Sequence, residues 1–200
     1  PIALTFPAYR ALFMHRRSGG AVFVEWSRGN SAYLRSDGYS RSWGCVLNAS
    51  VAMEKRMDDL VQRAKDLAHR AHAGQVDKAG RPYIEHVARV AAACADDPEA
   101  EAVAWLHDVL EDFGFPMRWA TDFPRDTRDS VIRLTRTKRE SSADYYALIA
   151  TDPVALRVKL ADIADNANES RLALLDDKTA ARLRRKYAKA IAALTGAAAG

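Results

Sequence analysis

Six residues in the middle of the chain, HDVLED (107–112), gather the side chains best suited to chemistry. On a helix, residues four apart share one face, as His107 and Glu111 would. Asp108 and Asp112 have the same spacing. His107 and Asp108 would project about 100° apart around the axis, so both could reach one ion lying against the helix. Imidazole and carboxylate ligands suit manganese, iron or zinc, and the two acids one turn further on could orient or deprotonate water.

The surroundings of this segment argue against a merely polar helix face, which is what a histidine–aspartate pair usually marks. The four ionisable residues alternate with large apolar ones: Trp105, Leu106, Val109 and Leu110. An unpaired charge is costly in such surroundings. A bound cation would remove that cost.

Two other segments place ionisable residues among apolar ones. In PYIEHVARVAAA, His86 lies in an alanine-rich stretch, where a lone histidine is usually a hydrogen-bonded core residue. In RVKLADIADN, Asp162 has apolar neighbours and is expected to point inward, with Lys159 and Asn166 about one helical turn away on either side. A buried carboxylate needs a cation or several donors, and a metal ion would supply the cation.

Helical spacing dominates the chain from Met53 onward. One helix is expected over 57–71, ended by Gly74, and a second begins at Pro82. A third is expected to begin after Pro98 and to continue to Gly114. Later helices are predicted near 125–137, 142–150, 154–166 and 178–195. Strand alternation is absent from this part of the sequence, so residues 53–200 are predicted to form one all-α bundle.

Residues 1–52 differ from the rest in pattern and in charge. Six arginines against Glu25 and Asp37 give 6 − 2 = +4, whereas the remainder carries 24 basic and 24 acidic residues, 24 − 24 = 0. The segment has no sustained period, although AVFVEW (21–26) could form a short strand. We expect an irregular N-terminal extension that is disordered or loosely packed. RNA binding through it would rest on charge alone, and a physiological start at Met53 or Met57 is an alternative.

The composition is that of a soluble globular domain, with 48% hydrophobic and 28% charged residues in 200. No stretch approaches the roughly 20 apolar residues of a membrane span, and no secretory pattern precedes the domain. Cys45 and Cys94 lack metal-type spacing. These features predict a cytoplasmic protein with two reduced thiols and no membrane partner.

Three segments, in this order, resemble a known family: AHAGQVDKAGRPYIEHVARVA, AWLHDVLEDF and VKLADIADN. They are similar to the hydrolase domain of RelA/SpoT-type enzymes and to the small alarmone hydrolases, over about residues 58–195. The resemblance implies an HD-domain helical fold with one divalent ion, usually Mn²⁺, and a reaction that removes the 3′-pyrophosphate of (p)ppGpp to leave GDP or GTP. The metal ligands that it implies are His86, His107, Asp108 and Asp162. It also assigns Glu111 and Asp112 to water activation and Asn166 to a place near the sugar of the nucleotide.

The loop after Gln75 departs from the family pattern. Asp77 stands where an arginine commonly packs on the guanine base, and Ala79 replaces a common serine, while Lys78 keeps a basic residue. An acid cannot supply the stacking contact of an arginine. Guanine recognition is therefore expected to differ, whereas the phosphates should be contacted by Lys78, Arg81 and Lys159. His69 and His72 are expected to be structural.

These observations predict a metal-dependent phosphohydrolase that acts on a nucleotide, with (p)ppGpp as the first candidate. Asp77 favours an alternative within the same class, another nucleotide or an NADPH-like phosphate ester. An alternative from another class is a catalytically silent HD domain that senses a nucleotide and signals to a partner. The intact set of ligands and acids argues against a silent domain.

Overall fold

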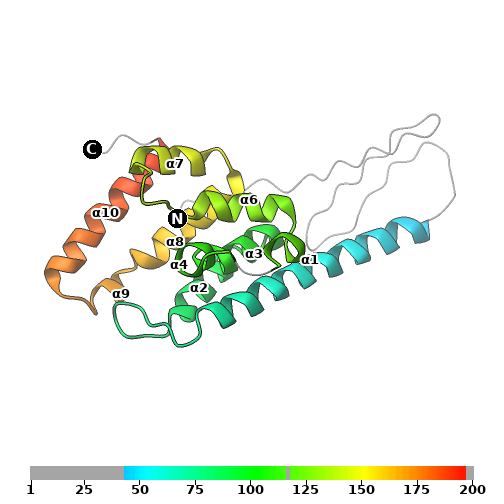
Figure 1. Cartoon of the computed structure of the whole chain (residues 1–200), viewed down its shortest axis with the longest axis horizontal. Coiled ribbons are helices and arrows are strands. Elements are labelled where there is room, and N and C mark those ends of the chain that lie inside the picture. The colour runs from blue at the N-terminus through cyan, green and yellow to red at the C-terminus, as the bar shows by residue number, and fades with distance from the viewer. Residues whose placement is uncertain (1–42, 116–117, 197–200) are drawn as a thin grey trace, which may run out of the picture. The chain divides into compact units, whose positions relative to one another are not determined.

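The computed structural model describes residues 43–115 and 118–196, and every regular element in these ranges is a helix (Figure 1). The helices are α1 (Trp43–Ala71), α2 (Tyr83–Ala92), α3 (Pro98–Leu106), α4 (Val109–Phe113), α5 (Trp119–Asp122), α6 (Arg125–Leu134), α7 (Ser142–Ala150), α8 (Pro153–Asn166), α9 (Glu169–Leu172) and α10 (Asp177–Thr195). Within the described residues the only pairing of β type is an isolated bridge between Val76 and Pro82. The predicted all-α class is confirmed.

The chain divides into two units, Pro1–Ala49 and Ser50–Gly200. The predicted extension lies outside the described residues up to position 42, and so does its candidate strand. Residues 43–52, which the sequence assigned to that irregular extension, are helical, because α1 begins at Trp43. The site lies wholly in the second unit, and none of the described helices is long and apolar enough to cross a bilayer.

Two helices that carry the site begin at the same local signal, an aspartate followed by a proline. The carboxylate of Asp97 accepts the backbone N–H groups of residues 99 and 100 at the start of α3. Asp152 caps α8 in the same way, through residues 154 and 155. Aspartate satisfies the free N–H groups of a first turn, and proline has no N–H to lose there. These caps set where α3 and α8 begin.

The predicted third helix is interrupted, which corrects the expectation of one helix from Pro98 to Gly114. Helix α3 ends at Leu106 and α4 starts at Val109, with His107 and Asp108 at the junction. The His107 ring donates from Nδ1 to the carbonyl of Ala104, at 2.7 Å. In an uninterrupted helix that carbonyl would accept the N–H of Asp108. The histidine side chain therefore competes with the helix at this point.

Helix α8 is the centre of the bundle, since it packs against α2, α3, α6, α7 and α10 (Figure 1). It is enclosed by buried apolar side chains of these elements, among them Val87, Val103 and Val131. Helix α1 adds one apolar face to the core, formed by Leu60, Ala64 and Ala68 at intervals of four residues. Residues of α8 that point inward are thereby removed from solvent.

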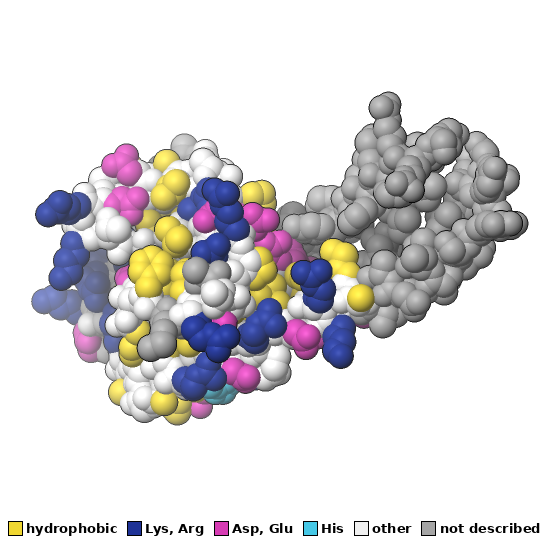
Figure 2. Space-filling model, turned by 45° about the vertical axis from the view of Figure 1, so that its right-hand side comes forward, with side chains coloured by type: hydrophobic (Ala, Val, Ile, Leu, Met, Phe, Trp, Pro, Cys, Tyr) yellow, Lys and Arg dark blue, Asp and Glu magenta, His cyan; other side chains and the backbone are white. Residues whose placement is uncertain are grey.

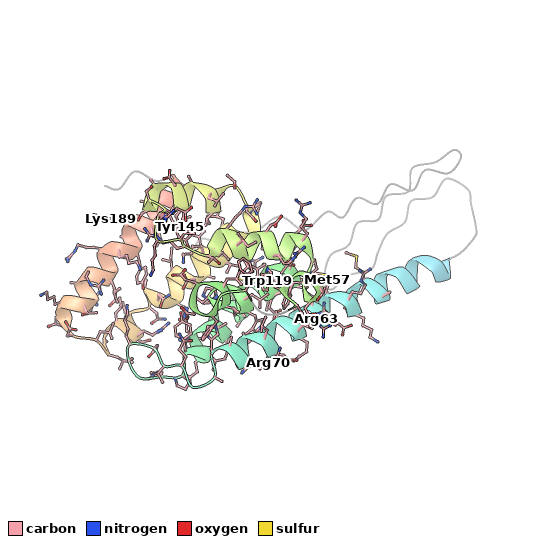
Figure 3. All side chains as sticks on the ribbon, in the orientation of Figure 1. Met57, Arg63, Arg70, Trp119, Tyr145 and Lys189 are labelled. Carbon is pink, nitrogen blue, oxygen red and sulfur yellow. The ribbon has the colours of Figure 1, made fainter. Side chains whose placement is uncertain are left out.

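Helix α1 is also tied to the segment around α5. The guanidinium of Arg63 donates to the backbone carbonyl of Asp122, at 3.2 Å. Figure 3 shows Met57, Arg63 and Arg70 along α1, with Trp119 beside the helix. Trp119 is buried and packs on Phe123, with the ring centroids 5.2 Å apart. Figure 3 shows Trp119 on the side of the bundle away from Lys189 of α10.

Candidate metal centre

Helix α2, the junction of α3 with α4, and α8 bring the four predicted ligands to one point. Ligand atoms of His86, His107 and Asp108 lie within 4.8 Å of one another. Oδ1 of Asp162 lies 3.3 Å from Nε2 of His86 and 3.9 Å from Nε2 of His107. Both histidines are almost fully buried. Residues up to 76 positions apart in the sequence (162 − 86) thus share one small volume.

Each histidine uses one ring nitrogen in a hydrogen bond that leaves the other facing the cluster. Nδ1 of His107 donates to the Ala104 carbonyl, and Nδ1 of His86 lies 2.6 Å from a carboxylate oxygen of Asp165. Because a carbonyl oxygen only accepts, Nδ1 of His107 carries the proton in the neutral ring, and the lone pair is on Nε2. Nδ1 of His86 also lies 3.1 Å from Nη1 of Arg171, which only donates, but its contact of 2.6 Å with the Asp165 carboxylate is shorter and assigns the proton of the neutral ring to Nδ1 there too. Both Nε2 atoms are buried and make no well-directed hydrogen bond among the described residues, although carboxylate oxygens face them, with Oδ2 of Asp108 3.0 Å from Nε2 of His107.

Buried atoms of this kind call for an explanation. Other buried atoms of the described residues, such as Nε2 of His72, also lack a partner, but the Nε2 atoms of His86 and His107 face the carboxylates of Asp162 and Asp108. Two imidazole lone pairs that face two carboxylates make a donor set suited to a divalent transition ion. The residues present therefore fit the metal that the sequence implies. His86, His107, Asp108 and Asp162 are the side chains that would hold it.

The two carboxylates are fixed by neutral and positive donors. The hydroxyl of Tyr83 donates to Oδ2 of Asp108, at 2.5 Å. Asp162 accepts from Nζ of Lys159 at 2.8 Å and from Nδ2 of Asn166 at 2.6 Å. Burial acts to raise the pKa of Asp162, but the charge of Lys159 and the nearby imidazoles hold it well below its usual range. Asp162 is therefore an anion ready to bind a cation.

In the metal-free protein, protons on the two imidazoles balance part of the negative charge of the carboxylates. Burial by itself lowers the pKa of the His107 imidazole, but the adjacent Asp108 carboxylate more than reverses this and raises it to about 9. The pKa of His86 is raised as well, because its contacts with Asp162 and Asp165 outweigh burial. A metal ion that binds here must displace these protons.

The two predicted catalytic acids lie on α4, both exposed, and each is held from a different side. Nε2 of Gln75 donates to Oδ2 of Asp112, at 2.8 Å, while Oε1 of Gln75 lies 2.5 Å from Nδ1 of His72. On the other side, the backbone N–H of Arg136 donates to Oε2 of Glu111, at 3.2 Å. Each acid keeps one carboxylate oxygen outside these contacts.

His72, expected to be structural, is buried and orients the Gln75 side chain that contacts Asp112. Its ring packs on Tyr83 and Phe113, with centroids 5.1 and 5.3 Å away. Since a carboxylate only accepts, the amide of Gln75 must point its nitrogen at Asp112 and its oxygen at His72. His72 thereby fixes the amide that holds Asp112. His69, in contrast, packs on Trp105, at 5.7 Å between centroids.

A group of cations lies around the carboxylates. Burial lowers the pKa of Lys186 on α10, and the charges of Lys159 and Lys78 lower it further, with a smaller effect of Arg136. Nζ of Lys159 lies 5.7 Å from the centre of the Tyr145 ring, and the Arg136 guanidinium lies 5.6 Å from it. Figure 3 shows Tyr145 on α7, next to α10. Lys159 and Arg136 therefore share the Tyr145 ring, and the charges of Lys159, Lys78 and Arg136 act on Lys186.

Two residues predicted to contact the substrate, Arg81 and Asn166, have other contacts in the structure. Arg81 is exposed and donates its backbone N–H to Asp77 at 3.0 Å, and among the described residues its side chain makes no hydrogen bond or ion pair with the cluster. Asn166 donates to the candidate ligand Asp162, so its amide is engaged at the metal centre. Arg136, Lys186, Gln75 and Asp165 were not found by sequence reasoning.

Comparison with known proteins points in one direction, although no family model matches the chain. Over 74% of its length the chain is 32% identical to a probable GTP pyrophosphokinase of Mycobacterium leprae, covering 21% of that protein. Over 68% it is 32% identical to the bifunctional (p)ppGpp synthase/hydrolase RelA of Mycobacterium tuberculosis, covering 20%. Over 53% it is 35% identical to a guanosine-3′,5′-bis(diphosphate) 3′-pyrophosphohydrolase of Aquifex aeolicus, covering 17%. The chain is similar to enzymes of (p)ppGpp metabolism.

This similarity supports the RelA/SpoT resemblance drawn from the three motifs. The chain spans about a fifth of the length of these relatives. Their names include both synthesis and hydrolysis, so the choice between the two activities depends on the site.

On the face that Figure 2 displays, Lys and Arg side chains are mixed with Asp and Glu, as on an ordinary protein surface.

Proposed function

We propose that the chain is a metal-dependent phosphohydrolase that removes the 3′-pyrophosphate of (p)ppGpp. The observation that carries the proposal is that two buried Nε2 atoms, which make no well-directed hydrogen bond among the described residues, face the carboxylates of Asp108 and Asp162. One divalent ion, with Mn²⁺ as first candidate, suits this donor set. When bound, such an ion offsets negative charge on a phosphoryl group and makes water more acidic.

The side chains around the ligands suit hydrolysis. Glu111 and Asp112 each have one oxygen held by Arg136 or Gln75, and the remaining oxygen can orient a water molecule and accept its proton. Lys159 and Lys186 can neutralise the phosphates of a nucleotide. Water would attack the phosphorus attached to the 3′ oxygen, and that oxygen would leave with a proton, which yields GDP or GTP and pyrophosphate.

A second candidate substrate is favoured by the contacts of the Asp77 carboxylate. Its Oδ2 accepts from Arg171 at 3.0 Å, and its Oδ1 accepts from the backbone N–H groups of Ala79 and Arg81. The position therefore offers no free cation to stack on guanine. The same hydrolytic centre would then act on another nucleotide or on an NADPH-like phosphate ester.

The deciding experiment is product analysis with the full chain after removal of metal and reloading with Mn²⁺. The substrates are ppGpp, pppGpp, ppApp and NADPH, and GTP with ATP serves as the test for pyrophosphokinase activity. Release of pyrophosphate from ppGpp supports the first proposal, and a Mn²⁺-loaded Asp112→Asn variant should lose it. Release of single phosphate from NADPH supports the second candidate. Transfer of pyrophosphate from ATP to GTP with no release of pyrophosphate from ppGpp would refute hydrolysis, and binding of ppGpp without turnover would indicate a sensor.

A further inference from the structure

Behind the candidate ligand His86 lies a charged cluster that the proposed reaction does not use. At its centre is Asp165 on α8, whose carboxylate is only 11% exposed. One of its oxygens, Oδ2, lies 2.6 Å from Nδ1 of His86, on the side of the ring opposite the metal centre. The other, Oδ1, accepts from Nε of Arg89 at 2.6 Å. The carboxylate therefore links the ring to a cation of α2.

A second arginine completes the cluster from α9. Nη1 of Arg171 donates to the same Oδ2 of Asp165 that contacts His86, and Nη2 donates to Oδ2 of Asp77 at 3.0 Å. The Arg171 side chain is 19% exposed and that of Asp77 is 10% exposed. One guanidinium thus lies between two largely buried carboxylates, one on α8 and one in the loop before α2.

Asp77 uses both of its carboxylate oxygens in this arrangement. Oδ1 accepts the N–H groups of Ala79 at 2.8 Å and of Arg81 at 3.0 Å, which closes the turn, while Oδ2 binds Arg171. The aspartate that departs from the family pattern therefore has a local function. It holds the turn and attaches it to the cluster through Arg171.

We propose that Asp165 is a positioning residue for the metal ligand His86, and that Arg171 couples this pair to the loop through Asp77. This inference rests on the metal centre proposed above. A carboxylate that accepts the second N–H of a ligating histidine fixes the tautomer and the ring orientation and makes the ligand more basic. Arg89 and Arg171 both donate to the Asp165 carboxylate, so its negative charge is paired with two cations beside the His86 ring.

The variant Asp165→Asn keeps the size of the side chain and an acceptor oxygen but removes the charge. We expect the dissociation constant for Mn²⁺ or Co²⁺, measured by titration of the metal-free full chain, to rise about tenfold to a hundredfold. Asp165→Glu restores a carboxylate and should recover part of the affinity. The matched control is Glu169→Gln, which removes an exposed carboxylate of α9 that is paired with Arg184 of α10 and should leave metal binding unchanged.

The spectrum of bound Co²⁺ reports the ligand geometry and should change in Asp165→Asn but not in Glu169→Gln. A folded Asp165→Asn protein with unchanged metal affinity and spectrum would overturn the role of Asp165. So would an Asp165→Glu protein that binds no better than Asp165→Asn. Wild-type protein that binds no divalent ion would instead refute the metal centre itself.

A direct measurement covers the case in which Asp165→Asn does not fold. In the wild-type protein loaded with diamagnetic Zn²⁺, the Nδ1–H of His86 should give a protected downfield proton resonance, typical of an imidazole bound to a carboxylate. Its presence supports the inference. A His86 ring with no proton on Nδ1 in the loaded protein would overturn it, whatever the variants do.

Discussion

Replacement of Asp162 by asparagine should destabilise the metal-free protein, because it leaves the ammonium of Lys159 without its carboxylate. Nζ of Lys159 lies 2.8 Å from Oδ2 of Asp162, and the two side chains are 18% and 9% exposed. Burial acts to lower the pKa of Lys159, but the charge of Asp162 raises it above its usual range. Lys159 therefore stays charged in this pair.

The size of the effect follows from this burial. Removal of one partner of a buried ion pair costs about 3–5 kcal/mol, and the residual exposure of Lys159 places the variant near the lower end, at about 3 kcal/mol. For a chain of this length, each kcal/mol lowers Tm by about 2–4 °C. Asp162→Asn should thus lower the Tm of the metal-free protein by about 6–12 °C.

The assay is thermal unfolding followed by circular dichroism, with a chelator present. The double variant Lys159→Met with Asp162→Asn removes the stranded ammonium as well and should regain part of the lost stability. A loss of less than about 1 kcal/mol for Asp162→Asn, the value of an exposed pair, would show that the pair is solvated and that the reasoning fails. Mn²⁺ should raise the Tm of the wild-type protein but not that of Asp162→Asn.

Three further predictions concern the same site. The pKa of His107 is raised from 6.5 to about 9, so its contribution to stability is complete below pH 6.5 and is lost as the pH rises through 9. Urea unfolding of the metal-free protein at several pH values should show this decline in the free energy of unfolding. An equal decline in His107→Gln would contradict the prediction. Asp112→Asn should retain Mn²⁺ and nucleotide but lose about 10²-fold or more in turnover, whereas loss of the metal would make Asp112 a ligand. Lys186→Met should raise KM for ppGpp about tenfold to a hundredfold at unchanged metal affinity; an unchanged KM would remove Lys186 from the substrate site.

Much of the helical framework could be predicted because it depends on local signals. Periodic apolar residues and the Asp–Pro pairs mark the starts of α3 and α8, and the predicted helix over 154–166 nearly coincides with α8. The break between α3 and α4 was missed, because it depends on the direction of one side chain. Residue spacing does not reveal that the His107 ring binds the carbonyl of Ala104.

In the candidate site, too, some residues could be predicted from local sequence, and others are brought there only by packing. Ionisable residues with apolar neighbours drew attention to Asp162 and to the segment around His107, and the structure places both at one point. Lys186 was missed because only the packing of α10 against α8 brings it near Lys159. Asp165 left a usable signal, since it follows Asp162 by one helical turn and must lie on nearly the same face.

The interrupted helix and the central α8 have a consequence for the order of events in folding. The four candidate ligands come from α2, the α3–α4 junction and α8, and they meet only after these three segments have docked. A chain that is still unfolded has no such site, so an ion would bind after the main barrier to folding and act as a late cross-link. Contacts formed after the transition state slow unfolding and leave the folding rate nearly unchanged. Metal loading should therefore lengthen the lifetime of the folded protein without speeding its formation.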